Sequence, residues 1–567
     1  MVLGAIVPLL PTLRAPFIYD DTTIIRDNPF LRGWGSLVHV WSLPYWSGDG
    51  GERLGLYRPA QQAMLALVWN IGNGSALLFH GYALLLGAAT AIAVWWLLRR
   101  AVGGTVAFVA ALWFATHPMH VEAIASVANT SELLVALCTI GLAWLLGDRV
   151  PPEGAHRSAV GRTVAIGLLA AAAIGAKESG LLAVPVAVLT AWGWRRPAGD
   201  GPSLVAFVRD QARDLTVAAA SVGVVILARL IVLGAPVSTA NIGAPGLSSL
   251  SATERAATML SLWPRLAGML LLPSSPSPYY GPSSIPDHAG GLAALSVAVA
   301  LALFGLAMVL ARRGDTRPLV AVGWIALTYL PASNLLTATG QLLSDRALFG
   351  ATIGATLSIA WGLECVPPVG RRVVAVLMAL AIARHAFITA HYAVAWTSHR
   401  ALWTRMIEVA PEEHLGYKLL GMDARARGDT ALAIRLLGRA LDMAPSDRQT
   451  RFELGQGQYA TGRYRAAVVT LSPLMLNTDA QSESGFVSLY LDAVGRSAGP
   501  AAVVRAATPL THSPSAPVAD LFIGIAQEQM GNRVAAESAY VAGLRRSAGD
   551  SALQSRYFAL HPEHVHH

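Results

Sequence analysis

Long apolar runs alternate with short polar connections from Met1 to about Tyr392. The runs are 14–21 residues long, close to the ~20 residues that an α-helix needs to cross a bilayer. From about Trp396 onward the charged residues return and the long apolar runs stop. The pattern predicts an all-α protein in two parts: a polytopic transmembrane helical bundle over residues 1–395 and a water-soluble domain over residues 396–567.

About eleven membrane spans are expected in the first part. Several are shorter than ~20 residues, so their ends are expected to extend into the neighbouring polar motifs. The first apolar segment has neither a basic start nor a small-residue cleavage site, so we interpret it as a short first span rather than a signal peptide. The expected spans are 1–14, 79–98, 104–117, 131–147, 163–176, 180–194, 215–233, 291–311, 318–332, 346–364 and 371–391.

Composition supports this division. Hydrophobic residues make up 54% of the 567 residues and charged residues only 13%, with a mean hydropathy of +0.48, whereas soluble domains carry roughly a quarter charged residues. The net charge of +8 does not indicate a nucleic-acid partner, because the arginines form short clusters between apolar runs. Cys138 and Cys365 both lie in apolar segments, so no disulfide framework is expected.

The basic clusters predict the orientation of the bundle. Lys and Arg in short loops favour the cytoplasmic side, and all the clusters can lie there at once if residues 235–290 form an excursion at the outer interface. The N-terminus is then cytoplasmic and the C-terminal domain extracytoplasmic. The clusters are Arg99-Arg100, the stretch 149–162, the stretch 195–213, Arg312-Arg313 with Arg317, and Arg371-Arg372.

In this orientation most of the unusual polar motifs fall on the outer face. Charged groups beside apolar spans are costly and usually face a water-filled cavity. Six such motifs on one face therefore predict one shared site. They are Tyr19-Asp20-Asp21, Tyr57-Arg58-Pro59, the stretch from His117 to Glu122, the stretch 177–180, Ala332-Ser333-Asn334 and Asp345-Arg346.

A 34-residue period runs through residues 413–551. Leu420-Gly421 recurs as Leu454-Gly455, and Ala433 recurs as Ala467. A further unit around Gly524 leaves room for one degenerate copy in between. Small residues at these offsets let paired helices pack closely, and the period is that of tetratricopeptide repeats. The domain is therefore expected to be an α-solenoid that binds a peptide or protein in its groove, or one that only caps the membrane part.

The pair Asp20-Asp21 is the sharpest chemical signal. A carboxylate next to a membrane span can take a proton from a hydroxyl nucleophile at the membrane surface. Two adjacent carboxylates repel each other, which raises the pKa of one of them. The structural alternative is a helix cap or a surface turn before Thr22-Thr23.

The motif His117-Pro118-Met119-His120-Val121-Glu122 offers two imidazoles and a carboxylate. A divalent metal bound by His117, His120 and Glu122 is one interpretation. Pro118 and the lack of an i,i+4 histidine pair weaken it. We favour a polar elbow that contacts the substrate, with no metal.

Lys177-Glu178 lies between two very apolar segments. Lys177 can bind an anionic phosphate while Glu178 orients that phosphate or an acceptor hydroxyl; the alternative is a buried pair that neutralises itself. Arg58 and Arg346 can also bind phosphate. We favour the interpretation that Asn334 satisfies backbone groups at a helix break; it is also a further candidate for the site.

Together these motifs resemble the transmembrane-and-tetratricopeptide-repeat O-mannosyltransferases and their bacterial relatives, in the glycosyltransferase C superfamily. The resemblance covers nearly the whole chain and rests on the order of the motifs. It implies a glycosyltransferase C bundle that transfers a sugar, mannose or another hexose, with inversion from a polyprenyl phosphate to a hydroxyl, such as a Ser or Thr of an acceptor protein. In that superfamily a carboxylate in the first outer loop acts as base, which points to Asp20, with Asp21 as neighbour or alternate.

The resemblance also implies the setting and the partners: a multi-pass protein of the bacterial inner membrane, a lipid-linked donor, and an acceptor protein held by the repeats. The chain departs from the family at Asn129-Thr130-Ser131-Glu132, where relatives often have an Arg, at Asp345, where they tend to have Glu, and at Phe349, where they tend to have Tyr. The competing hypothesis is a transporter or an assembly scaffold whose repeats recruit a partner. It predicts charged residues paired along a path through the spans, not gathered at one face.

Overall fold

The computed structural model describes residues 1–47, 55–148, 156–195, 203–235, 244, 246–477, 479 and 482–561. These residues form helices and connecting segments; among them β-structure is limited to one isolated antiparallel bridge between Tyr280 and Leu343. The chain divides into two compact units, Met1–Ala410 and Pro411–His567. The expected all-α class is confirmed. Parts of two expected basic loops, 149–155 and 196–202, lie outside the described residues.

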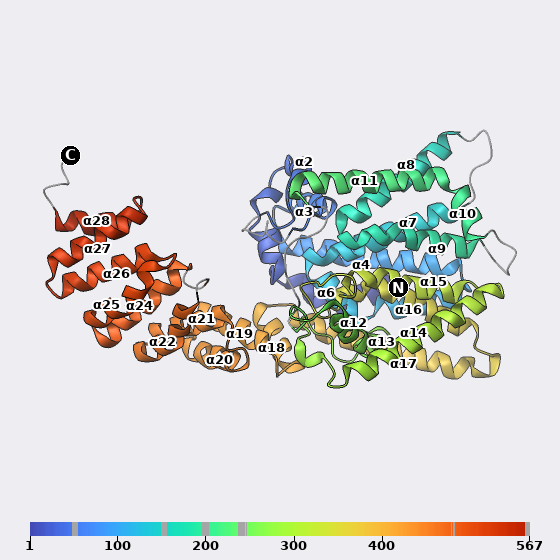
Figure 1. Ribbon diagram of the computed structural model, residues 1–567. Coiled ribbons are helices and arrows are strands. Elements are labelled where there is room, and N and C mark those ends of the chain that lie inside the picture. Colours follow the sequence, from blue (N-terminus) through green and yellow to red (C-terminus); the bar gives the residue numbers. More distant parts are fainter. Residues whose placement is uncertain are drawn as a thin grey trace. The chain divides into compact units, whose positions relative to one another are not determined.

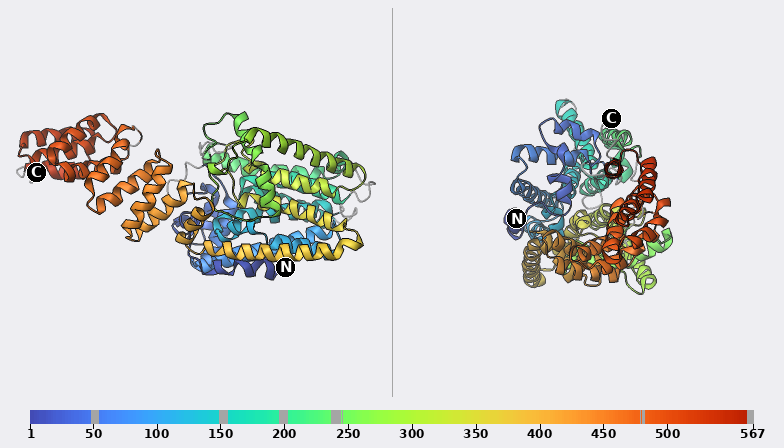
Figure 2. Two further views of the ribbon diagram at one scale, coloured as in Figure 1. Left: turned by 90° about the horizontal axis from the view of Figure 1, so that it is seen from below. Right: turned by 90° about the vertical axis from the view of Figure 1, so that its left-hand side faces the viewer.

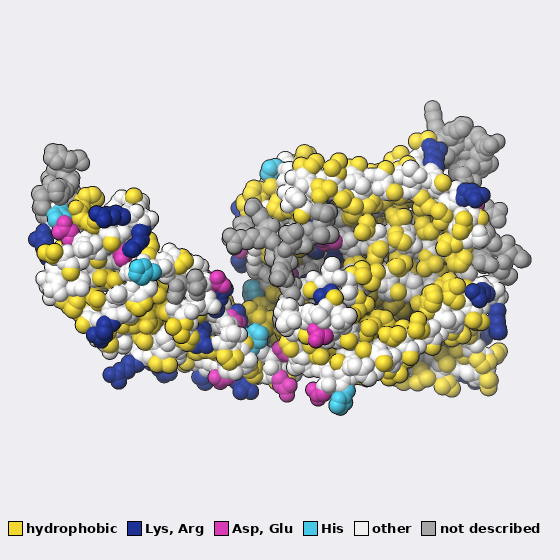
Figure 3. Space-filling view, in the orientation of Figure 1, with side chains coloured by type: hydrophobic (Ala, Val, Ile, Leu, Met, Phe, Trp, Pro, Cys, Tyr) yellow, Lys and Arg dark blue, Asp and Glu magenta, His cyan; other side chains and the backbone are white. Residues whose placement is uncertain are grey.

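Among the described residues of the first unit, six helical stretches are long and apolar enough to cross a membrane. They are predominantly apolar, and they lie side by side along their lengths (Figures 1 and 2). Hydrophobic side chains cover much of the visible flank of this unit (Figure 3). The six are Ala76–Arg99 (α4), Val127–Gly147 (containing α7, Ser131–Gly147), Ala212–Leu233 (α11), Ala289–Arg312 (α14), Arg346–Glu364 (containing α16, Phe349–Glu364) and Pro368–Ala395 (containing α17, Arg371–Ala395).

The other five expected spans are also helical, but shorter or less apolar, so length and composition alone do not identify them as spans, and the total of eleven stays a prediction. The first of them is not a regular α-helix. Pro8 and Pro11 lack a backbone N–H, so the chain continues as a 3-10 helix after one short α-helical turn. The five are α1 with η1 (Val2–Ile6 and Val7–Arg14), α5 (Gly104–Ala115), α8 (His156–Ala176), α9 (Ala183–Trp194) and α15 (Arg317–Tyr329).

The helices pack closely where small residues face each other. A Cβ atom at Gly354 of α16 would lie 2.6 Å from the backbone oxygen of Ala321 in α15. Such close backbone approach is typical of helix packing in membranes. In the same bundle the indole N–H of Trp324 donates to the hydroxyl of Thr190 at 2.8 Å, so the buried polar atoms of α15 and α9 satisfy each other.

The expected excursion at 235–290 contains two short helices with one apolar face each. They pack onto a buried cluster that includes Met119, Leu343 and Leu348. Another helix precedes α4 in a region where the sequence indicated only a motif. These additional helices are α12 (Ala252–Ser261), α13 (Trp263–Leu271) and α3 (Pro59–Gly72).

The boundary between the units lies later than the expected position at 395. Helix α18 (His399–Val409) belongs to the first unit. Leu402 and Trp403 are buried, and the ring of Trp403 meets that of Tyr19 edge-to-face at 5.6 Å. The polar composition of α18 hides this packing in the sequence, because only one face of the helix is apolar.

The second unit is a series of helices in which each packs on the next. Two helices, α24 and α25, lie between the second repeat and Gly524, where one degenerate copy was expected. The assignment to the tetratricopeptide family itself stays a prediction. The helices are α19 (His414–Ala426), α20 (Thr430–Met443), α21 (Arg448–Ala460), α22 (Tyr464–Leu471), α24 (Ser484–Ala498), α25 (Pro500–Ala507), α26 (Ala516–Gln529), α27 (Arg533–Arg546) and α28 (Ser551–Leu560).

Glycine-to-alanine variants of the second unit can test the role of the repeated glycines. We expect residues 411–567 alone to be soluble and helical, because the unit has its own apolar clusters. Gly455→Ala should lower its free energy of unfolding by about 1–3 kcal/mol, since a Cβ there would lie 2.5 Å from Leu471. Gly438→Ala is the control, because a Cβ at that helical glycine meets nothing within 4 Å and should be neutral or stabilising. Urea unfolding followed by circular dichroism measures both; equal effects would contradict the close-packing role.

Candidate functional site

The Tyr19-Asp20-Asp21 segment directs its two carboxylates into different surroundings. Tyr19 has a φ of +54°, a left-handed conformation that is uncommon for a residue with a bulky side chain. Its backbone N–H lies 3.2 Å from Nε2 of His399. Strained backbone of this kind is concentrated at functional sites. Asp20 and Asp21 follow it directly and make unlike contacts.

Asp21 is fully buried and holds two segments together. Its carboxylate accepts hydrogen bonds from the backbone N–H groups of Val127 at 3.0 Å and Ala128 at 2.8 Å, and from the hydroxyl of Ser126 at 3.3 Å. Burial raises the pKa of Asp21 to about 7, although the bonds from Ala128 and Val127 act in the opposite direction. Asp21 is therefore an anchor for the short helix η7 (Val127–Thr130), and it is not open to a substrate.

Asp20 instead faces a cluster of charged side chains that includes Arg346 and Arg58. Its side chain remains 21% exposed, and Oδ2 lies 3.8 Å from Nη1 of Arg346. Burial raises the pKa of Asp20, while the positive charges of Arg346 and Arg58 lower it. A partly exposed carboxylate with a raised pKa is suited to take a proton near neutral pH. Of the two carboxylates, Asp20 has the environment of a general base.

Arg346 is shared between Asp20 and Glu122. Its Nη1 donates to Oε1 of Glu122 at 2.9 Å, and its backbone N–H donates to Oε2 at 3.0 Å. The hydroxyl of Ser344 donates to the same Oε2 at 3.3 Å. Burial raises the pKa of Glu122, against the effect of Arg346. The sequence placed Arg346 at a phosphate; here two carboxylates surround its guanidinium.

Lys177 and Glu178 do not pair with each other, so the self-neutralising alternative is wrong. Lys177 is extended, at the start of the 3-10 helix η8 (Glu178–Leu182), and its ammonium donates to the carboxylate of Glu132. Oε2 of Glu178 accepts two bonds from Arg58, from Nε at 3.0 Å and from Nη2 at 2.8 Å. Burial alone would raise the pKa of Glu178, but the Arg58 guanidinium lowers it overall. In an extended segment adjacent side chains point to opposite sides.

Sequence reasoning missed Arg229, which joins this cluster from α11. Its Nη1 lies 3.7 Å from Oε1 of Glu178, and its Nη2 donates to the backbone oxygen of Gly55 at 2.6 Å. The signal was present, because Arg229 is the only charged residue between 215 and 233. An ionisable residue inside an apolar span is by default a functional candidate.

Glu132 was quoted in the sequence only as a departure from the family pattern. In the structure it supplies the partner of Lys177. Its position near the start of a span, beside the polar run Asn129-Thr130-Ser131, was the available signal.

The two histidines of the 117–122 motif are buried against aromatic rings. Nδ1 of His117 accepts from the backbone N–H of Met119 at 3.3 Å, and its Nε2 lies 3.1 Å from the oxygen of Leu270. Nε2 of His120 lies 2.8 Å from Oγ1 of Thr352. Both imidazoles thus have protein partners, and a contact between either of them and a substrate stays a prediction.

The contacts of His117, His120 and Glu122 can be compared with those expected of three ligands to one metal ion. Glu122 turns to Arg346, whereas His117 and His120 turn to Leu270 and Thr352. Within the described ranges no group of three or more His, Cys, Asp or Glu side chains is placed to hold a metal ion. The three residues do not converge as ligands must.

Asn334 stabilises a turn. It has a φ of +56°; its side-chain oxygen accepts from the backbone N–H of Thr339 at 2.6 Å, and its amide donates to the oxygen of Gln341 at 2.9 Å. The alternative that Asn334 satisfies backbone groups is therefore confirmed. A contact between Asn334 and substrate stays a prediction without structural support.

Asp345, which precedes Arg346, is buried and anchors a Ser- and Pro-rich segment, residues 273–284, within the expected excursion at 235–290. Its carboxylate accepts from the hydroxyl of Tyr280 at 2.6 Å and from the backbone N–H of Ser277 at 3.1 Å. Asp345 thereby connects the outer segment to the start of α16 and helps to position Arg346.

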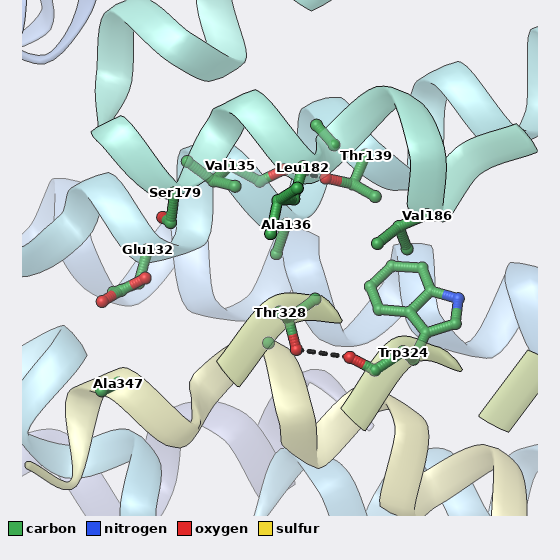
Figure 4. Close-up of a pocket in the computed structure, with 12 residues that line it drawn as sticks. Glu132, Val135, Ala136, Thr139, Ser179, Leu182, Val186, Trp324, Thr328 and Ala347 are labelled. Carbon is green, nitrogen blue, oxygen red and sulfur yellow. Dashed lines mark hydrogen bonds between the residues drawn. The ribbon is translucent and has the colours of Figure 1, made fainter. Parts of the chain in front are cut away.

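A narrow cavity of about 30 Å³ begins beside the charged cluster and lies between α7, α9, α15 and α16. Glu132 and Ser179 lie at one end, and Val186 and Trp324 lie at the other (Figure 4). One water molecule needs roughly 10–15 Å³ by this measure, so the cavity can admit water. The cavity shows that the charged cluster, through Glu132, borders apolar space inside the bundle.

Three known proteins that are similar to this chain in sequence share one name, protein O-mannosyl-transferase. The chain is 24% identical to protein O-mannosyl-transferase TMTC3 of Mus musculus over 487 residues, which is 80% of the chain and 52% of the relative. It is 22% identical to protein O-mannosyl-transferase Tmtc3 of Drosophila melanogaster over 79% of the chain and 55% of the relative. For TMTC3 of Homo sapiens the values are 23%, 78% and 51%. The chain thus spans about half the length of these curated relatives. No protein-family model matches it.

Proposed function

The chain is a relative of the protein O-mannosyl-transferases, and on this premise we propose that it is a membrane glycosyltransferase. It transfers mannose or another hexose from a polyprenyl-phosphate donor to a hydroxyl, the side chain of a Ser or Thr in an acceptor protein. The observation that carries the proposal is the position of Asp20: a partly exposed carboxylate 3.8 Å from Arg346, at the edge of a cluster that also holds Arg58 and Lys177.

The proposed reaction is a single inverting displacement. The acceptor oxygen attacks the anomeric carbon of the sugar, and Asp20 takes the hydroxyl proton as the new C–O bond forms. The bond between that carbon and the phosphate oxygen breaks, and the polyprenyl phosphate leaves with its electron pair. Negative charge grows on the phosphate, so fixed cations nearby stabilise the transition state more than the ground state.

We further propose that this site lies at the outer face of a plasma membrane, with the N-terminus in the cytoplasm. The alternation of basic loops supports this orientation, and so does the gathering of Asp20, Arg58, Lys177 and Arg346 in one cluster. The second unit then lies outside and presents the acceptor polypeptide. The helix pairs of that unit suit such a role, because stacked pairs form an extended binding surface.

The arrangement of charged residues supports the competing hypothesis, a transporter or an assembly scaffold, less well than it supports a transferase. A second buried ion pair, Arg162 with Asp214 at 2.9 Å, lies between α8 and α11 away from the proposed site. Buried apolar side chains such as Leu142, Ile166 and Ala170 fill the bundle around these helices. In the part of the chain that the structure describes, charged pairs therefore do not form a continuous path.

Mass spectrometry of cells with and without the gene tests the proposal. We expect a hexose-sized addition on Ser or Thr of exported proteins, and its loss when the gene is deleted. An unchanged set of modified proteins would contradict the transferase activity. A gene-dependent addition on cytoplasmic proteins would contradict the orientation but not the activity.

A further inference from the structure

Glu178 lies between two guanidinium groups. Arg58 donates two hydrogen bonds to one carboxylate oxygen, and Nη1 of Arg229 lies 3.7 Å from the other. The three side chains together carry two positive charges and one negative charge. This group of three side chains therefore holds one more positive charge than negative charge.

Arg229 is also short of hydrogen-bond acceptors. Its side chain is only 9% exposed, and Nη2 donates to the oxygen of Gly55. Within the described residues, Nε and Nη1 are buried without a hydrogen-bond partner. Buried polar groups are nearly always paired in native structures, and a buried cation without full pairing is costly. An anion bound beside Arg229 would remove both deficits.

The other cations of the site are already neutralised. Arg346 is shared by Asp20 and Glu122, so a phosphate placed there would meet two carboxylates. Lys177 is paired with Glu132. The cluster consequently has a negative side around Asp20 and a positive side around Arg58 and Arg229. A proton acceptor and a leaving phosphate need this separation, because the phosphate would otherwise be repelled.

The helix that carries Arg229 lies at the edge of the bundle. On α11 the buried residues are Asp214, Ala218, Val225 and Arg229, whereas Leu227 and Ile231 are 57% and 77% exposed. The guanidinium thus lies on the inner side of a helix whose outer side is apolar. An anion attached to a lipid can reach it at this edge without its chain crossing the bundle.

We propose that Arg58 and Arg229 form the binding site for the phosphate of a polyprenyl phosphate lipid, and that Glu178 occupies this site when the lipid is absent. The Glu178 side chain is 36% exposed, so it can turn outward when phosphate takes its place. The identification of the ligand with the sugar donor rests on the proposed function. Arg346 is then assigned to Asp20 rather than to the phosphate.

Binding of a sugar-free polyprenyl phosphate to the full-length protein in phosphatidylcholine nanodiscs tests the proposal, because this bilayer adds no net charge. Arg229→Met should weaken binding by about 10- to 100-fold, the worth of a hydrogen bond to a charged group. Glu178→Gln should tighten it, since a competing charge is removed. Arg213→Met, on the same helix but exposed, is the matched control and should leave binding unchanged.

The two variants are expected to change the affinity for the lipid in opposite directions. The Glu178→Gln result therefore still tests the site if Arg229→Met fails to fold. Normal affinity of Arg229→Met, or weakened binding by Glu178→Gln, would overturn the site. Inorganic phosphate is the second probe: if it binds with the same affinity and the same dependence on Arg229, the ligand is free phosphate and the lipid assignment is wrong.

Failure of this site and failure of the proposed function give different results. Because binding is measured without transfer, Arg229-dependent binding in a protein that modifies no acceptor would leave the site standing and refute the transferase. Transfer by Arg229→Met with an unchanged KM for the donor would refute the site and leave the transferase standing.

Discussion

Asp20→Asn is expected to lower the turnover of sugar transfer by about 10²–10⁴, the usual contribution of a positioned general base. Asparagine keeps the size of the side chain but cannot accept the proton of the acceptor hydroxyl. The amount of folded protein should stay close to normal, because the side chain is partly exposed and its nearest cation is 3.8 Å away. The measurement is transfer per mole of monodisperse protein with saturating donor.

Asp21→Asn is the matched control. Asparagine has one acceptor oxygen where the carboxylate of Asp21 uses two, so an amide N–H would face a backbone N–H. Leaving buried groups unsatisfied costs about 1–3 kcal/mol. We expect a lower midpoint of thermal unfolding with nearly normal turnover of the folded fraction. If Asp21→Asn abolished turnover at normal stability while Asp20→Asn remained active, the roles of the two carboxylates would be exchanged.

Arg346→Met is expected to act on both stability and pH dependence. It leaves Glu122 buried without its partner, and breaking a buried ion pair costs about 3–5 kcal/mol. It also removes the cation that lowers the pKa of Asp20, so that pKa should rise. Because the base works in its ionised form, kcat/KM falls as the pH drops through this pKa. The acid limb of the pH profile of kcat/KM should therefore move to higher pH.

The double variant Arg346→Met/Glu122→Gln separates the two effects. Neutralising Glu122 removes the unpaired buried charge, so much of the lost stability should return. The acid limb should stay above that of the unaltered protein, because Asp20 still lacks its nearby cation. An acid limb at the original pH in both variants would show that Asp20 is not the group that titrates in catalysis.

Local patterns in the sequence were enough to predict the helices. Each of the eleven apolar runs is helical, because in lipid a backbone must satisfy its hydrogen bonds within the helix. Gly421 and Gly455 marked helix pairs through their spacing, since a glycine at a helix crossing admits a large side chain from the next helix. Asp20 was identified because a carboxylate directly after a membrane span is costly unless it has a use.

The partners of the charged residues were decided by tertiary structure alone. Asp20 and Asp21 are adjacent and chemically identical, yet only the packing of residues 126–128 determines which is buried. Lys177 and Glu178 look like a pair in the sequence, but their partners lie 45 and 120 positions away. Arg229 acquires its meaning from Glu178, which a different helix supplies. Electrostatic interactions depend on distance in space, and a linear pattern of residue types does not encode that distance between separate helices.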